Sequence, residues 1–420
     1  MDFFNIDKSI LKLSERVTKE LSGTFARIDK ITEFNQHKVL AAFIKNKVSE
    51  QMFSASTGYG YGDRGRETLD RVLADALGAQ DAIIRHSFTC GTHTLSVMLF
   101  GVLRPGDTLL CVTGTPYDTI HSVIGLRGEG QGSLKDFGIN YRQVELDAEG
   151  HPDFEAIREA LLSDKTIKAV YIQRSRGYAL RDSLSVETIG GICDVVKQTS
   201  DALVLVDNCY GEFAEKQEPL AVGADLIAGS LIKNAGGGIA PSGGYIAGRR
   251  DLVELCSYRM TTPGLGREVG ATLGHSRELF MGLFNAPHVV GEAMKTACFA
   301  AGLFSAFGYD VTPKPDEVRH DIIQTLCLRD SETLCAFCRG LQKGAPVDSF
   351  VVPEAWDMPG YDSKVIMSAG AFTLGSSIEL SADAPLREPY AVWLQGGLNF
   401  HSAKLNIMLA AEEVRQTLAI

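Results

Sequence analysis

The stretch SLIKNAGGGIAPSGG, residues 230–244, places Lys233 between an apolar run and a glycine-rich loop. A lysine amine in such a position can attack a carbonyl group and can take up or release a proton. Asp207 stands 26 residues upstream, directly after the apolar run ALVLV. Because a nearby carboxylate stabilises a positive charge, the two side chains together predict covalent and acid–base chemistry.

An anion cradle and an aromatic side chain follow two further apolar runs. The segment Cys90-Gly91-Thr92-His93 opens the helical run TLSVMLFGVL. The backbone N–H groups of Gly91 and Thr92, next to Cys90, are therefore expected at a helix N-terminus, where anions bind. Tyr117, in TGTPYDT, follows the run TLLCV, and its ring can stack on a flat ligand. His93 is the alternative stacking residue.

Pyridoxal phosphate requires the four kinds of group that these segments supply. Lys233 can condense with the aldehyde of the cofactor, and Asp207 can keep the ring nitrogen protonated. The helix terminus and the Ser230 hydroxyl can hold the phosphate, and Tyr117 can stack on the ring. Each residue alone fits an ordinary structural role, but their joint order predicts a pyridoxal phosphate site in which Lys233, Asp207 and Tyr117 are catalytic.

Other motifs in the chain are incomplete. The residues from Ser230 to Lys233 match S-x-x-K, the nucleophile motif of penicillin-binding acyltransferases, but S-D-N and K-T-G do not occur. Neither G-x-x-x-x-G-K-[ST] nor a G-x-G-x-x-G after the first strand is present, which disfavours a nucleotide site. Cys335 and Cys338 form a CxxC within the helical run SETLCAFCRGL, without partners at zinc-ligand spacing, so no metal site is predicted.

The chain alternates apolar runs of strand length with helical segments. This alternation predicts right-handed βαβ units and a mostly parallel, seven-stranded sheet covered on both faces. In such a sheet ligands bind at the carboxyl ends of the strands, where the candidate residues stand. The predicted strands are DAIIRH, DTLLCV, NYRQVEL, IKAVYIQ, ALVLVD, DLIAGSL and GGYIAG.

The pattern changes towards each end of the chain. Two amphipathic helices are expected near residues 9–21 and 35–48, which form an N-terminal helical arm, residues 1–50. After the loop TTPGLGRE, a long helical stretch reaches residue 307, and the runs DIIQTLCL, SKVIMSAG and YAVWLQGG then precede a last helix from residue 400. We therefore expect a large cofactor-binding domain, residues 51–290, and a smaller α+β domain, residues 291–420.

Composition excludes several classes of partner. The 41 basic and 52 acidic residues give a net charge of −11, which repels nucleic acid and anionic membrane surfaces. The amino terminus MDFFNIDKSILKLSERV lacks the basic region of a signal peptide, and no apolar stretch reaches the roughly 18 residues of a membrane span. Nine scattered cysteines do not suggest disulfides. A cytoplasmic location is expected.

Several stretches resemble the methionine gamma-lyase-related proteins of bacteria, also called aluminium-resistance or cystathionine beta-lyase family proteins. The resemblance covers nearly the whole chain and implies a fold-type-I pyridoxal phosphate enzyme in which Lys233 holds the cofactor. The hydroxyl residue that better-known lyases carry just before this lysine is replaced by Ile232. The matching stretches are TGYGYGDRGRETLDRVLADALGAQDA, SFTCGTHTLSVMLFGVLRPGD, TGTPYDT, VDNCYGEF, SLIKNAGGGIAPSGGYIAGR and LREPYAVWLQGGLNF.

The resemblance also implies a homodimer or homotetramer with composite active sites. In the relatives, a tyrosine and an arginine of an N-terminal loop reach the phosphate of the neighbouring subunit. Here the loop is Tyr59-Gly60-Tyr61-Gly62-Asp63-Arg64-Gly65-Arg66, whose spacing departs from the Tyr-x-Arg of those lyases. Tyr61 and Arg66 are the candidates for cofactor binding and Tyr59 for substrate binding, with Arg64 as the alternative to Arg66.

The cofactor implies an amino acid substrate, whose α-carboxylate requires a cation. Arg387 in PLREPY is the first candidate because a guanidinium binds carboxylates through two hydrogen bonds. Arg176, with Arg174 and Ser175 after the strand IKAVYIQ, is a further candidate. The favoured function is a carbon–sulfur lyase that releases a 2-oxo acid and ammonia from a methionine-, cystathionine- or cysteine-like substrate. An aldolase, decarboxylase or transaminase, or a noncatalytic pyridoxal phosphate-binding protein, remains the alternative.

Overall fold

The computed structural model describes residues 3–357 and 363–417. These residues divide into two compact units. The large unit comprises Phe34–Ala286, and the small unit comprises Met1–Glu33 together with Pro287–Ile420. The sequence places domain boundaries at residues 50 and 290, whereas the compact units divide after residues 33 and 286. The N-terminal residues thus group with the C-terminal part of the chain.

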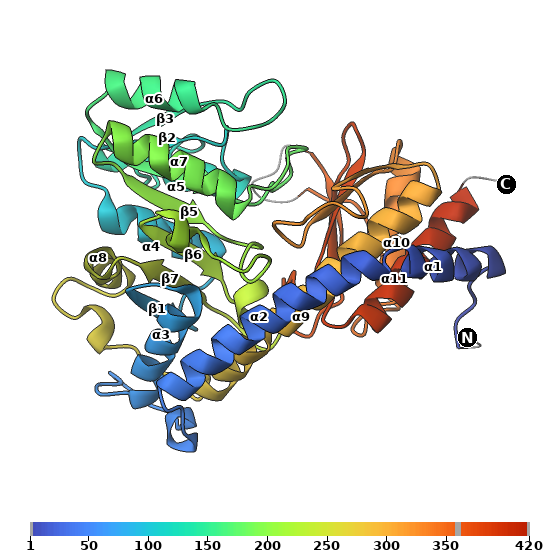
Figure 1. Cartoon of the computed structure of the whole chain (residues 1–420), viewed down its shortest axis with the longest axis horizontal. Coiled ribbons are helices and arrows are strands. Elements are labelled where there is room, and N and C mark those ends of the chain that lie inside the picture. The colour runs from blue at the N-terminus through green and yellow to red at the C-terminus, as the bar shows by residue number, and fades with distance from the viewer. Residues whose placement is uncertain (1–2, 358–362, 418–420) are drawn as a thin grey trace. The chain divides into compact units, whose positions relative to one another are not determined.

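In the described residues, the sheet of the large unit has seven strands in the order β1-β7-β6-β5-β4-β2-β3 (Figure 1). Neighbouring strands from β3 to β6 run parallel, and β7 pairs antiparallel with both β6 and β1. This arrangement confirms the predicted mostly parallel sheet, and each strand lies within its predicted run. The strands are β1 (Asp81–Arg85), β2 (Thr108–Cys111), β3 (Asn140–Gln143), β4 (Ile167–Gln173), β5 (Leu203–Asp207), β6 (Leu226–Ser230) and β7 (Gly244–Gly248).

Both faces of this sheet are buried, which explains why its strands are continuous apolar runs. Alternate strand residues such as Leu109, Tyr171 and Leu205 join one hydrophobic core with residues of α4, α5 and α8. The intervening residues, such as Val170 and Val204, are fully buried as well. The helices of the large unit are α3 (Arg64–Leu77), α4 (Gly91–Val102), α5 (Asp118–Ile124), α6 (Phe154–Ser163), α7 (Val186–Thr199) and α8 (Arg250–Met260).

The small unit contains an antiparallel sheet of five strands, counted over its described residues, in the order β10-β11-β12-β9-β8. Helices α10 and α11 pack against each other, and α10 also contacts β10 and β11. The elements are β8 (Asp310–Thr312), β9 (Gln324–Cys327), β10 (Val365–Ser368), β11 (Ser381–Pro385), β12 (Ala391–Gln395), α1 (Lys8–Glu20), α10 (Ser331–Lys343) and α11 (Phe400–Thr417). Two long helices, α2 (Ser22–Lys45) and α9 (Ser276–Ala306), contribute residues to both units.

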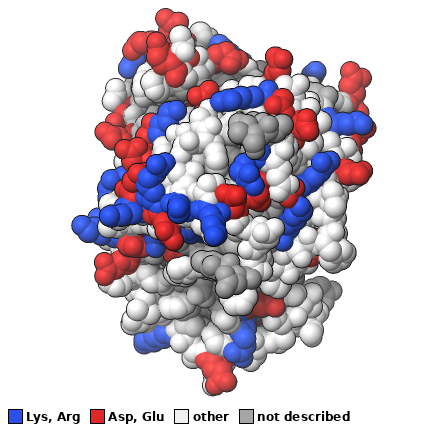
Figure 2. Space-filling model, turned by 90° about the vertical axis from the view of Figure 1, so that its right-hand side faces the viewer, with Lys and Arg blue, Asp and Glu red and all other residues white. Residues whose placement is uncertain are grey.

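Charged side chains of both signs are mixed on the surface. On the face that Figure 2 shows, basic and acidic side chains alternate and are separated by uncharged surface. Within the described part of the chain, none of the helices has the length and apolar character that crossing a bilayer requires. The same residues contain no group of His, Cys, Asp and Glu side chains arranged to hold a metal ion.

Candidate active site

Lys233 follows the end of β6 and begins the glycine-rich turn. Its side-chain nitrogen Nζ lies 4.2 Å from the ring centroid of Tyr210. A Cβ atom on Gly236 would overlap the carbonyl of Leu231, so only glycine allows the chain to turn back so closely after the lysine. Burial alone would lower the pKa of Lys233, but the acidic groups around it, including Asp207, raise that pKa above its ordinary value.

Asp207 ends β5, the parallel neighbour of β6. The residue is 7% exposed, and its carboxylate accepts a hydrogen bond from the backbone N–H of Cys209 at 3.1 Å. The Tyr171 hydroxyl lies 3.5 Å from its other oxygen. Burial raises the pKa of Asp207, and the charge of Lys233 opposes that shift. The structure therefore brings the two sequence-predicted groups to the same edge of the sheet and couples their charges.

The predicted anion cradle lies where the N-terminus of α4 meets the end of β6. Cys90 is the N-cap, and its Sγ accepts a hydrogen bond from the backbone N–H of His93 at 3.4 Å. A Cβ atom on Gly91 would lie 3.3 Å from Cβ of Ser230, tighter than side chains normally pack. Ser230 is fully buried, and the Thr92 hydroxyl lies 2.7 Å from that of Thr119. The first N–H groups of a helix have no partner within the helix, so this terminus suits a phosphate.

The two candidates for ring stacking both lie next to these strand ends. Tyr117 is the N-cap of α5, and its backbone N–H donates to Oε1 of Gln173 at 2.6 Å. Its ring meets that of Tyr178 edge-on, with centroids 5.7 Å apart. The ring of His93 meets Phe88 edge-on, and burial lowers the pKa of His93. The assignment of Tyr117 as the stacking residue stays a prediction.

A buried acidic group that the sequence analysis missed lies beneath this edge. The Glu212 side chain is fully buried, its Oε1 accepts a hydrogen bond from the Tyr245 hydroxyl at 2.8 Å, and its Oε2 has no partner among the described residues. Burial raises the pKa of Glu212 to about 8. Gly229 in β6 leaves the space for this carboxyl group, because a Cβ atom there would overlap Glu212 and Tyr245. The signal was the acidic residue in VDNCYGEF, five positions after Asp207.

The arginine side chains that follow β4 pair with other residues of the same chain. Arg174 is fully buried and donates to Oδ1 of Asn208 at 2.8 Å and to Oε1 of Glu215 at 2.9 Å. Arg176 is also buried, with its guanidinium 3.6 Å from the carboxylate of Asp182. Arg174 thus connects the ends of β4 and β5, and the predicted substrate role of Arg176 stays a prediction.

The loop from Tyr59 to Arg66 contains both exposed and buried side chains. Tyr59 and Tyr61 are 70% and 62% exposed, and their rings stack with centroids 5.4 Å apart. Arg66 is buried and donates to the carbonyls of Gly60 at 2.8 Å and Gly270 at 2.7 Å, which fixes the loop. Arg64, the first residue of α3, is exposed. Of the two arginines, Arg64 has the side chain that can reach outward.

Arg387 belongs to the small unit, in the turn between β11 and β12. The side chain is exposed and has no ion pair or hydrogen bond to any described residue. Its backbone closes the turn, since its N–H donates to the carbonyl of Pro385 and its carbonyl accepts from Tyr390. The proposed carboxylate contact of Arg387 stays a prediction.

Comparison with known proteins identifies the family. The family model for methionine gamma-lyase matches residues 10–415. The chain belongs to the methionine gamma-lyase family. It is 46% identical to the uncharacterized protein YnbB of Bacillus subtilis over 96% of each chain. The crystal structure of a carbon-sulfur lyase involved in aluminum resistance from Clostridium novyi is 51% identical, covers 97% of this chain and 96% of that one, and superposes with a TM-score of 0.94.

A more distant structure shares the fold. The pyridoxal-5′-phosphate-dependent protein YhfS of Escherichia coli is 14% identical, covers 93% of this chain and 97% of that one, and has a TM-score of 0.63. These findings confirm the predicted fold class, and pyridoxal phosphate is the cofactor of this methionine gamma-lyase family member. The site fits that cofactor: a lysine and a carboxylate lie at adjacent strand ends, and a helix N-terminus packs against Ser230. The chain is thus an enzyme of the carbon–sulfur lyase family.

Proposed function

We propose that this enzyme eliminates the sulfur substituent from a sulfur-containing amino acid. The products are a 2-oxo acid, ammonia and either sulfide or a thiol, with one water consumed for each substrate. The observation that carries the proposal is the coupling of Lys233 and Asp207 at the ends of two adjacent parallel strands. This pair supplies both a proton acceptor for the substrate and a fixed negative charge for the cofactor ring.

The residues have separate tasks in this proposal. Bound pyridoxal phosphate supplies an electron sink for the negative charge that develops at the substrate Cα. The amine of Lys233 takes the α-proton, because proton transfer from carbon needs a base held in place. Asp207 keeps the ring nitrogen protonated. The N–H groups at the start of α4 and the Ser230 hydroxyl hold the phosphate.

The leaving sulfur needs a proton when its bond to carbon breaks. Lys233 carries the proton removed from Cα and lies against the Tyr210 ring, so its ammonium group can donate this proton. The acidic groups that raise the pKa of Lys233 favour this protonated form after the first transfer. The same residue thus serves first as base and then as acid.

The test is a product assay on the enzyme loaded with pyridoxal phosphate. Cysteine, methionine, cystathionine and, as a sulfur-free control, alanine are supplied separately, and 2-oxo acid, ammonia and thiol or sulfide are measured. Equal amounts of all three products from at least one sulfur substrate, and none from alanine, support the proposal. Release of carbon dioxide, or a 2-oxo acid formed only when an amino acceptor is added, indicates a decarboxylase or a transaminase instead and overturns it.

A further inference from the structure

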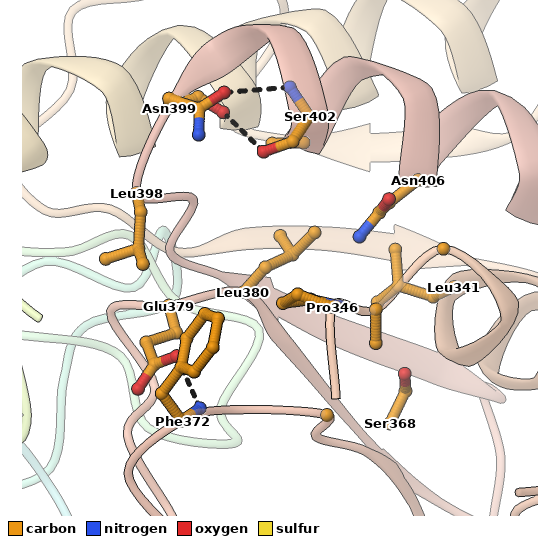
Figure 3. A pocket seen from close by; sticks show the side chains of 14 residues that line it. Leu341, Pro346, Ser368, Phe372, Glu379, Leu380, Leu398, Asn399, Ser402 and Asn406 are labelled. Carbon is orange, nitrogen blue, oxygen red and sulfur yellow. Dashed lines mark hydrogen bonds between the residues drawn. The ribbon is translucent and has the colours of Figure 1, made fainter. Parts of the chain in front are cut away.

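A cavity of about 230 Å³ lies within the small unit, to which all its described lining residues belong (Figure 3). Its walls are the C-terminal end of α10 with the residues that follow, the start of α11, and the segments around β10 and β11. Leu341, Pro346, Leu380 and Leu398 give it an apolar lining. Pockets for drug-sized ligands measure about 300–1,000 Å³, so this one suits a smaller molecule.

Asn406 on α11 supplies an unpaired polar group to this cavity. The residue is only 5% exposed, and its side-chain amide has no hydrogen-bond partner among the described residues. Figure 3 shows the amide directed into the cavity. A Cβ atom on Gly344 would overlap Oδ1 of Asn406, so the glycine allows the amide to pack closely against α10. The amide atoms are not among the unpartnered side-chain atoms that are closed off from solvent, so water in the cavity can bind them, and a ligand that displaces this water must provide an acceptor in its place.

The other buried polar side chains of the described lining already have partners. The Ser368 hydroxyl lies 3.3 Å from Oε1 of Gln342, to which it donates. The Glu379 carboxylate accepts hydrogen bonds from the backbone N–H groups of Phe372 at 2.8 Å and Thr373 at 2.9 Å. Among the buried polar side chains of the described lining, Asn406 is therefore the one left without a partner, whereas Asn399 and Ser402 are exposed.

Charge narrows the class of ligand further. Glu379, which is 7% exposed, is the one ionisable residue among the described lining residues, and none of them is Lys, Arg or His. An anion entering the cavity would leave water without gaining a counter-ion, next to a carboxylate of the same sign. An anionic group is therefore disfavoured where the ligand meets Asn406.

We propose that this cavity is a binding site for a small, uncharged aliphatic compound with a carbonyl oxygen, which accepts a hydrogen bond from Asn406. The aliphatic part of the ligand packs between Leu380, Leu398 and Leu341. Nothing in this proposal requires the lyase activity, because all the residues that carry it belong to the small unit.

The experiment uses three probes with the same branched carbon chain on the full-length protein loaded with pyridoxal phosphate. They are 4-methylpentan-2-one, which only accepts hydrogen bonds, the anion 3-methylbutanoate and the cation 3-methylbutylamine. Ligand-observed NMR detects binding, and titration calorimetry gives the affinity. The ketone is expected to bind at least about tenfold more tightly than the anion, because the anion pays a larger desolvation cost and is repelled by the Glu379 carboxylate.

Two variants of Asn406 link the binding to the amide. Asn406→Leu should weaken ketone binding about tenfold or more, and the near-isosteric Asn406→Asp should bind the amine in preference to the ketone because a carboxylate only accepts. Asn285→Asp is the matched control, since this half-buried asparagine of the large unit donates to the Met281 carbonyl. A ketone that does not bind, or that binds both Asn406 variants as well as the unaltered protein, overturns the proposal. Thermal melting of each variant shows that it is folded.

Discussion

The strand-end cluster of Lys233 and Asp207 and the loop from Tyr59 to Arg66 both contain groups suited to the cofactor, but they differ in how those groups are held. Asp207 is buried, and its partners come from the same chain. In the loop, Arg66 is used to fix the backbone, whereas the two tyrosines and Arg64 are exposed. The cluster is therefore assembled within one chain, whereas the exposed loop groups are available for contact with another molecule.

The largest loss of activity is expected from Lys233→Ala, a change within the cluster. The variant loses the base that removes the α-proton, and 2-oxo acid release should fall by about 10²–10⁴-fold. Borohydride treatment followed by mass spectrometry should find the cofactor fixed to the peptide that contains residue 233 in the unaltered protein and to none in the variant. Lys216→Ala, an exposed lysine of the same unit, is the control. Fixation of the cofactor on a different lysine would contradict the assignment.

Asp207→Asn tests the second member of the cluster. The change keeps the shape of the side chain but removes the charge that holds the ring nitrogen protonated, so α-proton exchange should slow by about 10²–10³-fold. The cofactor should remain bound, because Lys233 and the helix terminus are unchanged. Asp201→Asn, an exposed aspartate just before the same strand, is the matched control. Exchange at a normal rate in Asp207→Asn would show that another group sets the electron sink.

Subunit mixing tests the contrast between the cluster and the loop directly. If Tyr61 and Arg64 complete the site of a neighbouring copy, inactive Lys233→Ala chains and inactive Tyr61→Phe, Arg64→Ala chains should together regain about one quarter of full activity. One of the two sites in each hybrid dimer then receives both its lysine and its loop from unaltered segments, and about half of the dimers are hybrids.

The control mixture combines two kinds of chain that are each altered within the cluster. Lys233→Ala chains mixed with Asp207→Asn chains should regain no activity, because each site then lacks one of two groups that come from the same chain. Native mass spectrometry confirms that the chains exchange. Recovery in both mixtures, or in neither despite exchange, would disprove the composite site.

Much of the fold could be predicted because the strands of the large unit are buried on both faces and appear as apolar runs. The strands of the small unit were harder to predict. The strand β11 has the sequence SADAP, whose residues have low strand propensity, and β8 has only three residues. Helix α2 begins at Ser22, well before the predicted residue 35, although Gly23 and Thr24 are weak helix formers. Phe25 packs its ring against Phe400, 5.0 Å away, so tertiary packing overrides local propensity there.

One part of the candidate site could be predicted, because residues that follow neighbouring parallel strands must lie close together. Lys233 and Asp207 follow neighbouring strands, so the parallel order of the sheet was enough to bring them together. The environment of Glu212 could not be predicted, because it depends on a space beneath β6 that Gly229 leaves open. Sequence spacing also could not separate Arg64 from Arg66, since their difference lies in the direction each side chain takes from the start of α3.

The smallest effect concerns the stability that Glu212 contributes at different pH values. Its pKa is raised from 4.5 to about 8 in the folded chain, so between these values the folded state binds more protons than the unfolded state. Stability therefore falls as pH rises through this window, by at most about 1.4 kcal/mol per pH unit for one proton. Glu212→Gln lacks this proton, so its melting temperature relative to the unaltered protein should increase steadily from pH 5 to pH 8. Glu149→Gln, on an exposed loop, should give a constant difference. A constant difference in melting temperature between Glu212→Gln and the unaltered protein across this range would mean that the buried carboxyl group does not hold its proton.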